Sequence, residues 1–243
     1  MLLSFSTYAA EESDYYRIVT LPTPEGVPFE VGGLELLPDG RIAAAIRKGE
    51  VWIVDGAYAE PPVDLSFSLI ATALHEPLGL LLDKGDLLTT QRTEVTRLRD
   101  TNGDDVIDEY LTEAKGWGVS GNYHEYAFGP ARDGQGRLWI TLNQTMGPLI
   151  VEDDTWRGWG GIIEDGKFVP LCVGMRSPCG IGTNPKGDMF YTDQQGTWNA
   201  TGTLHHMRKG AFFGYPDSLK DAHLPESPIT PPGEIVANVP MAE

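Results

Sequence analysis

The chain has 243 residues, of which 41% are hydrophobic, and this is enough for the core of one large domain or of two small ones. Thirty-five acidic residues against eighteen basic ones give a net charge of −17. That charge disfavours binding to nucleic acid or to an anionic membrane surface. No apolar run approaches the roughly 18 residues that a membrane-spanning helix needs, so the sequence predicts no transmembrane segment.

The first segment, residues 1–13, places a short apolar stretch before the small residues Ala9 and Ala10 and then becomes acidic. This pattern is typical of the end of a secretory signal peptide, although no Lys or Arg precedes the apolar stretch. A disordered N-terminus explains it equally well. A signal peptide would direct the protein to the periplasm or out of the cell. Residues 14–243 are expected to form one domain.

Four later segments share one pattern: a strand that opens with Gly and apolar residues, a turn rich in Pro, Asp and Gly, and a second strand that leads into a polar loop. They begin at Gly33, Pro77, Tyr126 and Pro178. In the first of them the turn is Pro38-Asp39-Gly40, whose residue types favour a tight reversal between antiparallel strands. The sequence therefore predicts four β-hairpins.

The hairpins recur about every 45 to 50 residues, a period typical of propeller blades built from four antiparallel strands. Further strands are predicted at 50–56, 94–100 and 160–174, and no long stretch has the period of an amphipathic helix. We therefore predict an all-β protein, a β-propeller of about four blades. A propeller hides its sheet edges by closing its ring, and the tail at 225–243 stops where another blade would begin, so we expect a C-terminally truncated piece of a larger ring.

An acidic segment at 100–110, "DTNGDDVIDEY", has the oxygen-rich spacing of a calcium loop. The candidate ligands are Asp100, Asn102, Asp104 and Asp108. The segment is not an EF-hand, because an EF-hand would have a glycine and a bidentate glutamate at positions occupied here by other residues. A bound calcium ion and a solvated acidic turn both remain open.

Four of the five histidines occur in His75-Glu76, His124-Glu125 and His205-His206. None has the spacing of a helical zinc motif, so zinc is disfavoured. We single out His124, because a loop that enters the first strand of a blade faces the central channel, where propellers build their sites. The alternative is an ordinary hydrogen-bonded loop histidine.

The two cysteines, Cys172 and Cys179, are seven positions apart. Spacing alone cannot establish a disulfide. A disulfide and two buried free thiols are both compatible with the sequence.

Four segments, read in order, resemble the glucose/sorbosone dehydrogenase family of quinoprotein propellers, and within it the branch labelled membrane-bound dehydrogenase domain. They are "HEPLGLLL" (75–82), "YAFGP…GRLWITLN" (126–143), "GMRSPCGIGTNPKGDMFYTDQQG" (174–196) and "LHHMRKGAFFGYP" (204–216). The resemblance covers most of residues 30–216. It implies a six-bladed ring, of which this chain would hold about four blades, with pyrroloquinoline quinone (PQQ) and calcium bound over the central face.

The resemblance also implies site residues. His124 would take the hydroxyl proton of a sugar or related alcohol, since a neutral imidazole can accept a proton near pH 7. Arg176 would contact the quinone or the substrate. Because no Asp or Glu stands at 142–144 to orient the imidazole, we expect Glu125 from the same loop or Glu76 from the preceding blade to do so. Four residues that flank the strand pair predicted after Arg176 would complete the cofactor contacts. They are Ser177, Gln194, Gln195 and Gly196.

The chain departs from the family at two places. Leu142-Asn143-Gln144 stands where the family's strand ends in the carboxylate that orients the base, and Ser177 and Cys179 replace an asparagine and a glutamine. We expect a PQQ-dependent sugar or alcohol dehydrogenase, with a redox partner to take up the electrons. The alternatives are a non-catalytic propeller that binds carbohydrate or protein, and a calcium-dependent lactonase-like hydrolase.

Overall fold

The computed structural model describes residues 11–59, 62, 64–147, 153–194 and 202–230. In this part of the chain fifteen strands form four antiparallel sheets, three with four strands and one with three. The strands are β1 (Val31–Leu36), β2 (Ile42–Ile46), β3 (Glu50–Asp55), β4 (Ser66–Ala71), β5 (Leu81–Asp83), β6 (Asp86–Thr90), β7 (Val95–Arg99), β8 (Glu109–Ala114), β9 (Ala127–Arg132), β10 (Leu138–Leu142), β11 (Trp159–Glu164), β12 (Lys167–Val173), β13 (Pro178–Thr183), β14 (Met189–Asp193) and β15 (Thr203–His206). Two short 3-10 helices, η1 (Glu12–Asp14) and η2 (Pro216–Asp221), lie outside the sheets.

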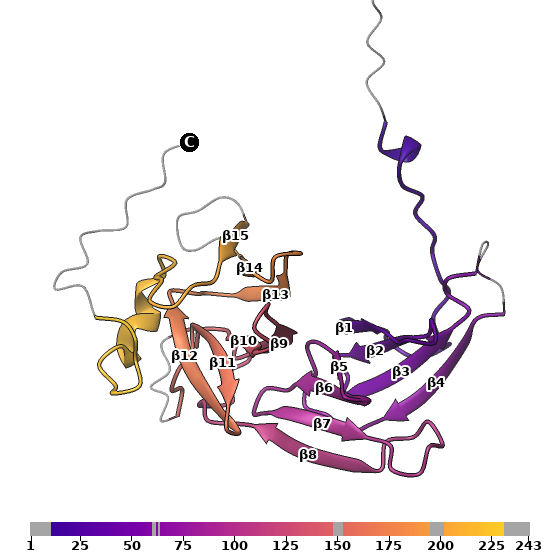
Figure 1. Ribbon diagram of the computed structural model, residues 1–243, viewed down its shortest axis with the longest axis horizontal. Helices are drawn as coiled ribbons and strands as arrows, with labels where there is room; N and C mark the ends of the chain where they lie inside the picture. Colours follow the sequence, from indigo (N-terminus) through magenta and orange to yellow (C-terminus); the bar gives the residue numbers. More distant parts are fainter. Residues whose placement is uncertain (1–10, 60–61, 63, 148–152, 195–201, 231–243) are drawn as a thin grey trace, which may run out of the picture.

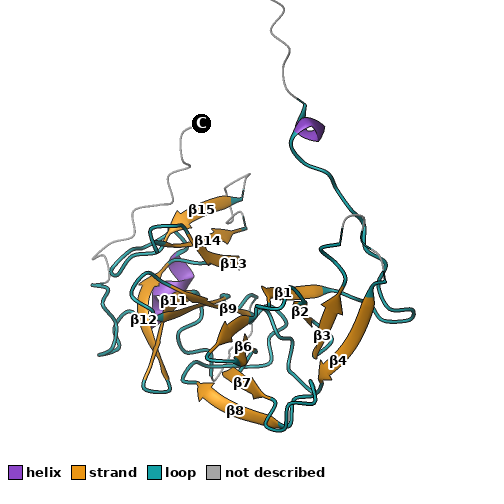
Figure 2. Ribbon diagram, turned by 45° about the vertical axis from the view of Figure 1, so that its right-hand side comes forward, coloured by secondary structure: helices purple, strands orange, loops and turns teal. Residues whose placement is uncertain are grey.

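Each sheet is a meander in which strands adjacent in sequence pair with one another. The sheets follow one another around an arc, with β4, β8 and β12 on the outside (Figure 1). Figure 2 shows the same arc from a second direction, and the described strands do not close it into a ring. The predicted all-β propeller of about four blades is confirmed.

The predicted hairpin turns join the first two strands of their blades. Gly40, Gly85 and Gly187 have φ values of 89°, 93° and 82°, a left-handed conformation that glycine adopts without steric cost. Backbone amides also bond inside these turns, as between the Gly40 amide and the Leu37 carbonyl, 3.0 Å apart. Local sequence therefore determines these reversals.

Other glycines let the blades approach each other closely. A Cβ atom on Gly33 would lie 2.4 Å from the Cα of Gly79, and one on Gly79 would lie 2.2 Å from the carbonyl oxygen of Gly129. The Gly129 amide donates to the Leu78 carbonyl at 3.0 Å, which joins the second blade to the third. Glycine is thus required at Gly33 and Gly79, near the start of the first two repeats, where neighbouring blades touch backbone to backbone.

Apolar side chains fill the spaces between blades. One cluster, which includes Ala45 and Leu98, joins the first two blades, and a second, centred on Trp159 and Ile140, joins the second to the third. A third cluster around Tyr191 joins the third blade to the fourth. Each blade depends on its neighbours to bury its faces.

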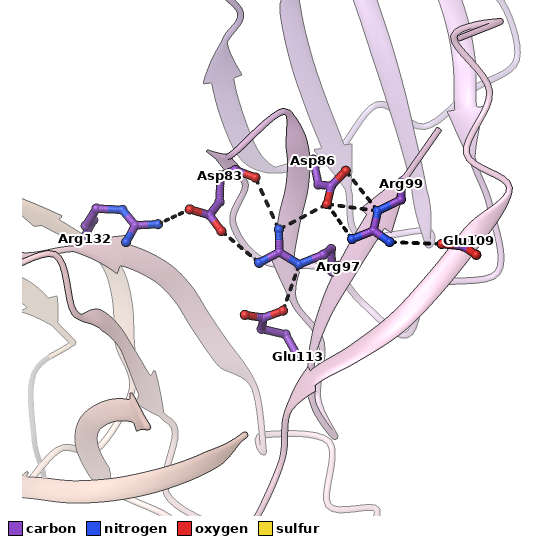
Figure 3. A network of polar contacts seen from close by, with 7 residues as sticks. All are labelled: Asp83, Asp86, Arg97, Arg99, Glu109, Glu113 and Arg132. Atoms are coloured by element: carbon purple, nitrogen blue, oxygen red, sulfur yellow. Dashed lines mark hydrogen bonds and ion pairs between the residues drawn. The ribbon is translucent and has the colours of Figure 1, made fainter. Parts of the chain in front are cut away.

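A network of ion pairs reinforces the contact between the second and third blades (Figure 3). Arg97 on β7 donates to Asp83 at 2.8 Å, to Asp86 at 3.2 Å and to Glu113 at 2.8 Å. Asp83 also accepts from Arg132 of β9 at 2.7 Å. The network therefore crosses from one blade to the next.

The N-terminal prediction concerns residues 1–13, and residues 1–10 lie outside the described part of the chain. The signal-peptide and disorder hypotheses therefore stay predictions. No helix among the described residues is long and apolar enough to cross a membrane. Cys172 is buried, Cys179 is exposed and both are free thiols, so the structure contains neither the disulfide nor a pair of buried thiols.

Candidate functional site

His124 lies in the loop that joins β8 to β9, and both of its ring nitrogens are hydrogen bonded. Nδ1 is 2.8 Å from the carbonyl oxygen of Gln144, and Nε2 is 2.8 Å from Oγ of Ser177. Because a carbonyl oxygen can only accept, Nδ1 carries the proton in the neutral ring. Nε2 is then the acceptor, and the Ser177 hydroxyl donates to it.

Arg176 and Ser177 form the turn between β12 and β13. The Asp193 carboxylate, at the end of β14, accepts from the backbone amides of Arg176 at 3.0 Å and Ser177 at 2.8 Å. Nη1 of Arg176 donates to Ser177 Oγ at 3.1 Å and to Gln194 Oε1 at 3.0 Å. The Asp193 carboxylate therefore holds the backbone of the turn, while the Ser177 side chain contacts His124.

The electrostatic environment keeps His124 neutral. Burial lowers the pKa of His124, and the positive charges of Arg176 and Arg92 lower it further, against the opposing effects of the Gln144 carbonyl and the Asp193 carboxylate. Burial also raises the pKa of Asp193. Near pH 7 the imidazole is thus an unprotonated base whose Nε2 lone pair accepts from the Ser177 hydroxyl.

Arg176 has donor capacity that the described residues do not use. Its Nη1 donates to two neutral acceptors, Ser177 Oγ and Gln194 Oε1, and the Tyr215 phenol also interacts with the guanidinium. Its Nε is buried and has no hydrogen-bond partner among the described residues. None of these partners is a carboxylate, so the positive charge of the guanidinium is left for an anionic or carbonyl oxygen of a ligand.

A buried arginine holds the loop that carries His124. Arg157 is 0% exposed, and its hydrogen-bond acceptors among the described residues are all backbone carbonyls. It reaches Gly118 at 2.7 Å, Glu125 at 3.1 Å, Tyr126 at 3.0 Å and Arg92 at 3.3 Å. Burial lowers its pKa to about 10. The Arg157 side chain therefore fixes both ends of the segment 118–126.

The two glutamates that the sequence suggested as orienting groups have other partners. The Glu125 carboxylate is 0% exposed and accepts from the amide and hydroxyl of Ser120, at 2.7 and 2.6 Å, and from the Thr145 hydroxyl at 2.7 Å. Glu76 forms ion pairs with Arg47 and Arg92. The Gln144 carbonyl, and neither glutamate, accepts from the imidazole.

Glu76 still affects the loop indirectly. Arg92, which pairs with it, donates to the carbonyls of Asn122 at 2.8 Å and Tyr123 at 2.6 Å. The Arg92 guanidinium also stacks 4.6 Å from the centre of the Tyr126 ring. Glu76 and Glu125 therefore support the backbone around His124 from two sides.

The structure brings four of the predicted site residues into one hydrogen-bonded group: His124, Ser177, Arg176 and Gln194. Gln195 and Gly196 lie outside the described residues. No sequence pattern indicates the Gln144 carbonyl, because any residue can supply a backbone oxygen. Asp193, directly before the predicted Gln194, was overlooked, although a carboxylate at a strand end is a recognisable pattern.

The acidic loop at 100–108 lies between β7 and β8, apart from His124. Asp100 accepts from the backbone amides of Asn102, Gly103 and Asp105 at 3.1, 2.7 and 2.8 Å. Asp108 accepts from the amide of Thr101 at 3.1 Å. The described residues contain no group of three or more His, Cys, Asp or Glu placed to hold a metal ion, and calcium at this loop stays a prediction.

No protein-family model matches the sequence, and no curated protein does. Solved structures do match the fold. One is a glucose dehydrogenase, with a TM-score of 0.61 and 18% identity over 77% of this chain and 64% of the other. Another is the PQQ-bound form of an aldose sugar dehydrogenase from Streptomyces coelicolor, with a TM-score of 0.57 and 16% identity over 78% and 64% of the two chains.

A third match is the apo form of the soluble aldose sugar dehydrogenase from Escherichia coli, with a TM-score of 0.58 and 16% identity over 77% of this chain and 63% of the other. The chain thus spans a little under two thirds of these three structures. At such identities the likeness shows the fold. The chain has the β-propeller fold of PQQ-dependent sugar dehydrogenases, as the sequence resemblance implied.

Proposed function

We propose that this propeller is part of a PQQ-dependent dehydrogenase that oxidises a sugar or a related alcohol. The observation that carries the proposal is His124, a neutral histidine with its Nε2 lone pair directed toward the Arg176–Ser177 turn. Oxidation of an alcohol needs a positioned base for the hydroxyl proton, and an arginine beside that base can bind an oxygen of the quinone or the substrate. The fold of the solved sugar dehydrogenases supports it.

In this proposal His124 Nε2 accepts the hydroxyl proton of the substrate. The Gln144 carbonyl keeps the proton on Nδ1 and so keeps Nε2 available. Ser177 must release Nε2 when the substrate hydroxyl binds there, and Arg176 can retain the Ser177 hydroxyl through its Nη1 contact. The base therefore needs no change of tautomer before it acts.

Arg176 would hold one acidic oxygen of the quinone, because its hydrogen-bond acceptors among the described residues, Ser177 and Gln194, are neutral. Gln194, bonded to the same guanidinium, would hold its orientation. The bound quinone would supply the hydride acceptor. Gln195 and Gly196 stay predicted contacts on sequence grounds.

The proposal includes calcium and an extracytoplasmic location. Calcium would bind either with the quinone or at the acidic loop that contains Asp100. The leader-like residues 1–13 are the basis for a periplasmic or secreted protein. Immunodetection in cell fractions tests the location, and signal confined to the cytoplasmic fraction contradicts it.

The experiment is titration of the purified chain with PQQ in millimolar calcium, followed by reduction of an artificial dye on a panel of sugars and alcohols. We expect saturable quinone binding that Arg176→Ala weakens and that Arg208→Ala, at an exposed arginine, leaves unchanged. Dye reduction should fall in acid as His124 becomes protonated, at a pH below the ordinary histidine value of 6.5. Quinone binding without dye reduction on any substrate would instead favour the non-catalytic binding propeller.

A further inference from the structure

Beyond the redox proposal, we propose that Ser177 is a nucleophile activated by His124, and that the site hydrolyses small carboxylic esters or lactones. The evidence is a continuous hydrogen-bonded chain in which the Ser177 hydroxyl donates to His124 Nε2 and His124 Nδ1 donates to the Gln144 carbonyl, each at 2.8 Å. A nucleophile, a base and a group that orients the base are the three parts that acyl transfer requires.

The protonation states suit this role. Burial and the charges of Arg176 and Arg92 lower the pKa of His124, so that Nε2 is free to remove the serine proton at neutral pH. The orienting group is a backbone carbonyl and not a carboxylate, and it stabilises an imidazolium less well. We therefore expect slow turnover compared with a serine hydrolase that has an aspartate in this position.

Arg176 would stabilise the negative charge that develops during acyl transfer. Its Nη1 lies 3.1 Å from Ser177 Oγ, and its buried Nε has no acceptor among the described residues. In this proposal the oxyanion of the tetrahedral intermediate, one bond length from the attacked carbon, accepts from this guanidinium, and a fixed donor there lowers the barrier. The Asp193 carboxylate holds the Arg176 and Ser177 amides and so keeps the turn rigid.

The reaction is balanced without a cofactor. Ser177 Oγ forms a bond to the acyl carbon, its proton passes to His124 Nε2, and the bond from that carbon to the leaving oxygen breaks as the proton moves to the alcohol. Water then attacks the acyl-serine, giving up a proton through His124 and releasing the acid. The starting hydroxyl of Ser177 is regenerated.

The test is covalent labelling of the purified chain with a fluorophosphonate, in the absence of quinone, followed by intact and peptide mass spectrometry. Ser177 Oγ should bond to phosphorus as fluoride leaves. We expect one adduct, located at Ser177, that is absent in Ser177→Ala and forms at least about tenfold more slowly in His124→Ala. Ser68→Ala, at an exposed serine of β4, should label like the parent.

Two further measurements make the test decisive. Melting curves of both site variants should overlie the parent curve, and hydrolysis of p-nitrophenyl acetate should be lost in Ser177→Ala. A labelling rate unchanged by His124→Ala, or an adduct that persists in Ser177→Ala, would overturn the proposal, as would no labelling of the folded parent. The labelling experiment contains no quinone, so a negative result does not bear on the dehydrogenase proposal. Equally, a failure of the chain to bind quinone does not bear on the hydrolase proposal.

Discussion

Replacing Arg157 with methionine should destabilise the protein through the loop that carries His124. The guanidinium donates to four carbonyls. Two of these keep another donor, since the Arg92 carbonyl accepts from Trp117 at 2.7 Å and the Tyr126 carbonyl from the Asn143 amide at 2.9 Å. The carbonyls of Gly118 and Glu125 have no other donor recorded among the described residues.

Each buried carbonyl left without a donor costs about 1 to 3 kcal/mol, which gives about 2 to 6 kcal/mol for two. Methionine recovers part of this loss, because it fills much of the space and removes the penalty of burying a cation. We therefore expect the free energy of unfolding to fall by about 3 kcal/mol.

The assay is equilibrium unfolding in urea, with Arg208→Met as the control at an exposed arginine. Hydrogen exchange at 118–126 should rise in Arg157→Met and not in the control, because the segment loses the donor to its Gly118, Glu125 and Tyr126 carbonyls. A loss of less than about 1 kcal/mol, with unchanged exchange in that segment, would refute the role assigned to Arg157.

Three other perturbations test the site, the acidic loop and the interblade network. In the quinone-loaded protein, His124→Ala should lower dye turnover by roughly 10² without changing the melting temperature, and equal turnover would make His124 an ordinary loop residue. Calcium should raise the melting temperature by mass action, and Asp100→Ala with Asp104→Ala should abolish the rise; identical curves in chelator and in millimolar calcium would support the solvated turn. Arg97→Met should lower the free energy of unfolding at pH 7, measured by urea titration, by about 3 kcal/mol. The Arg97 hydrogen bond lowers the pKa of Asp83 in the folded state, so this stabilisation is present above the unfolded value near 3.8 and is lost as pH falls through the folded value. If the difference in the free energy of unfolding between the parent and Arg97→Met stays the same in acid, the stabilising pair of Arg97 with Asp83 is contradicted.

The hairpins could be predicted because each is decided within a few residues. Gly40, Gly85 and Gly187 all adopt positive φ values at predicted turns, and alternate residues of the strands then face the neighbouring blades. The requirement for glycine at Gly33 and Gly79 has a different origin, because it arises where two blades touch. The sequence displayed these glycines as a repeat and could not show what they contact.

The candidate site could be predicted only in part. His124 and Arg176 were identified from motifs, and the structure connects them through Ser177. Glu125, adjacent to His124 in sequence, was a natural choice to orient the ring. Its backbone instead directs its carboxylate to Ser120 and Thr145, because successive side chains of an irregular loop need not share a direction.

The all-β class, the blade period and the places where the chain reverses can be predicted from the amino-acid sequence, because these depend on contacts between near neighbours. The surroundings of His124 instead depend on how the blades pack together. Its two ring partners are 20 and 53 positions away along the chain, and one of them is a backbone oxygen that every residue type carries. Packing of the third blade against the fourth brings these groups together, and the burial that results is also what lowers the pKa of His124 and leaves its Nε2 free to accept a proton.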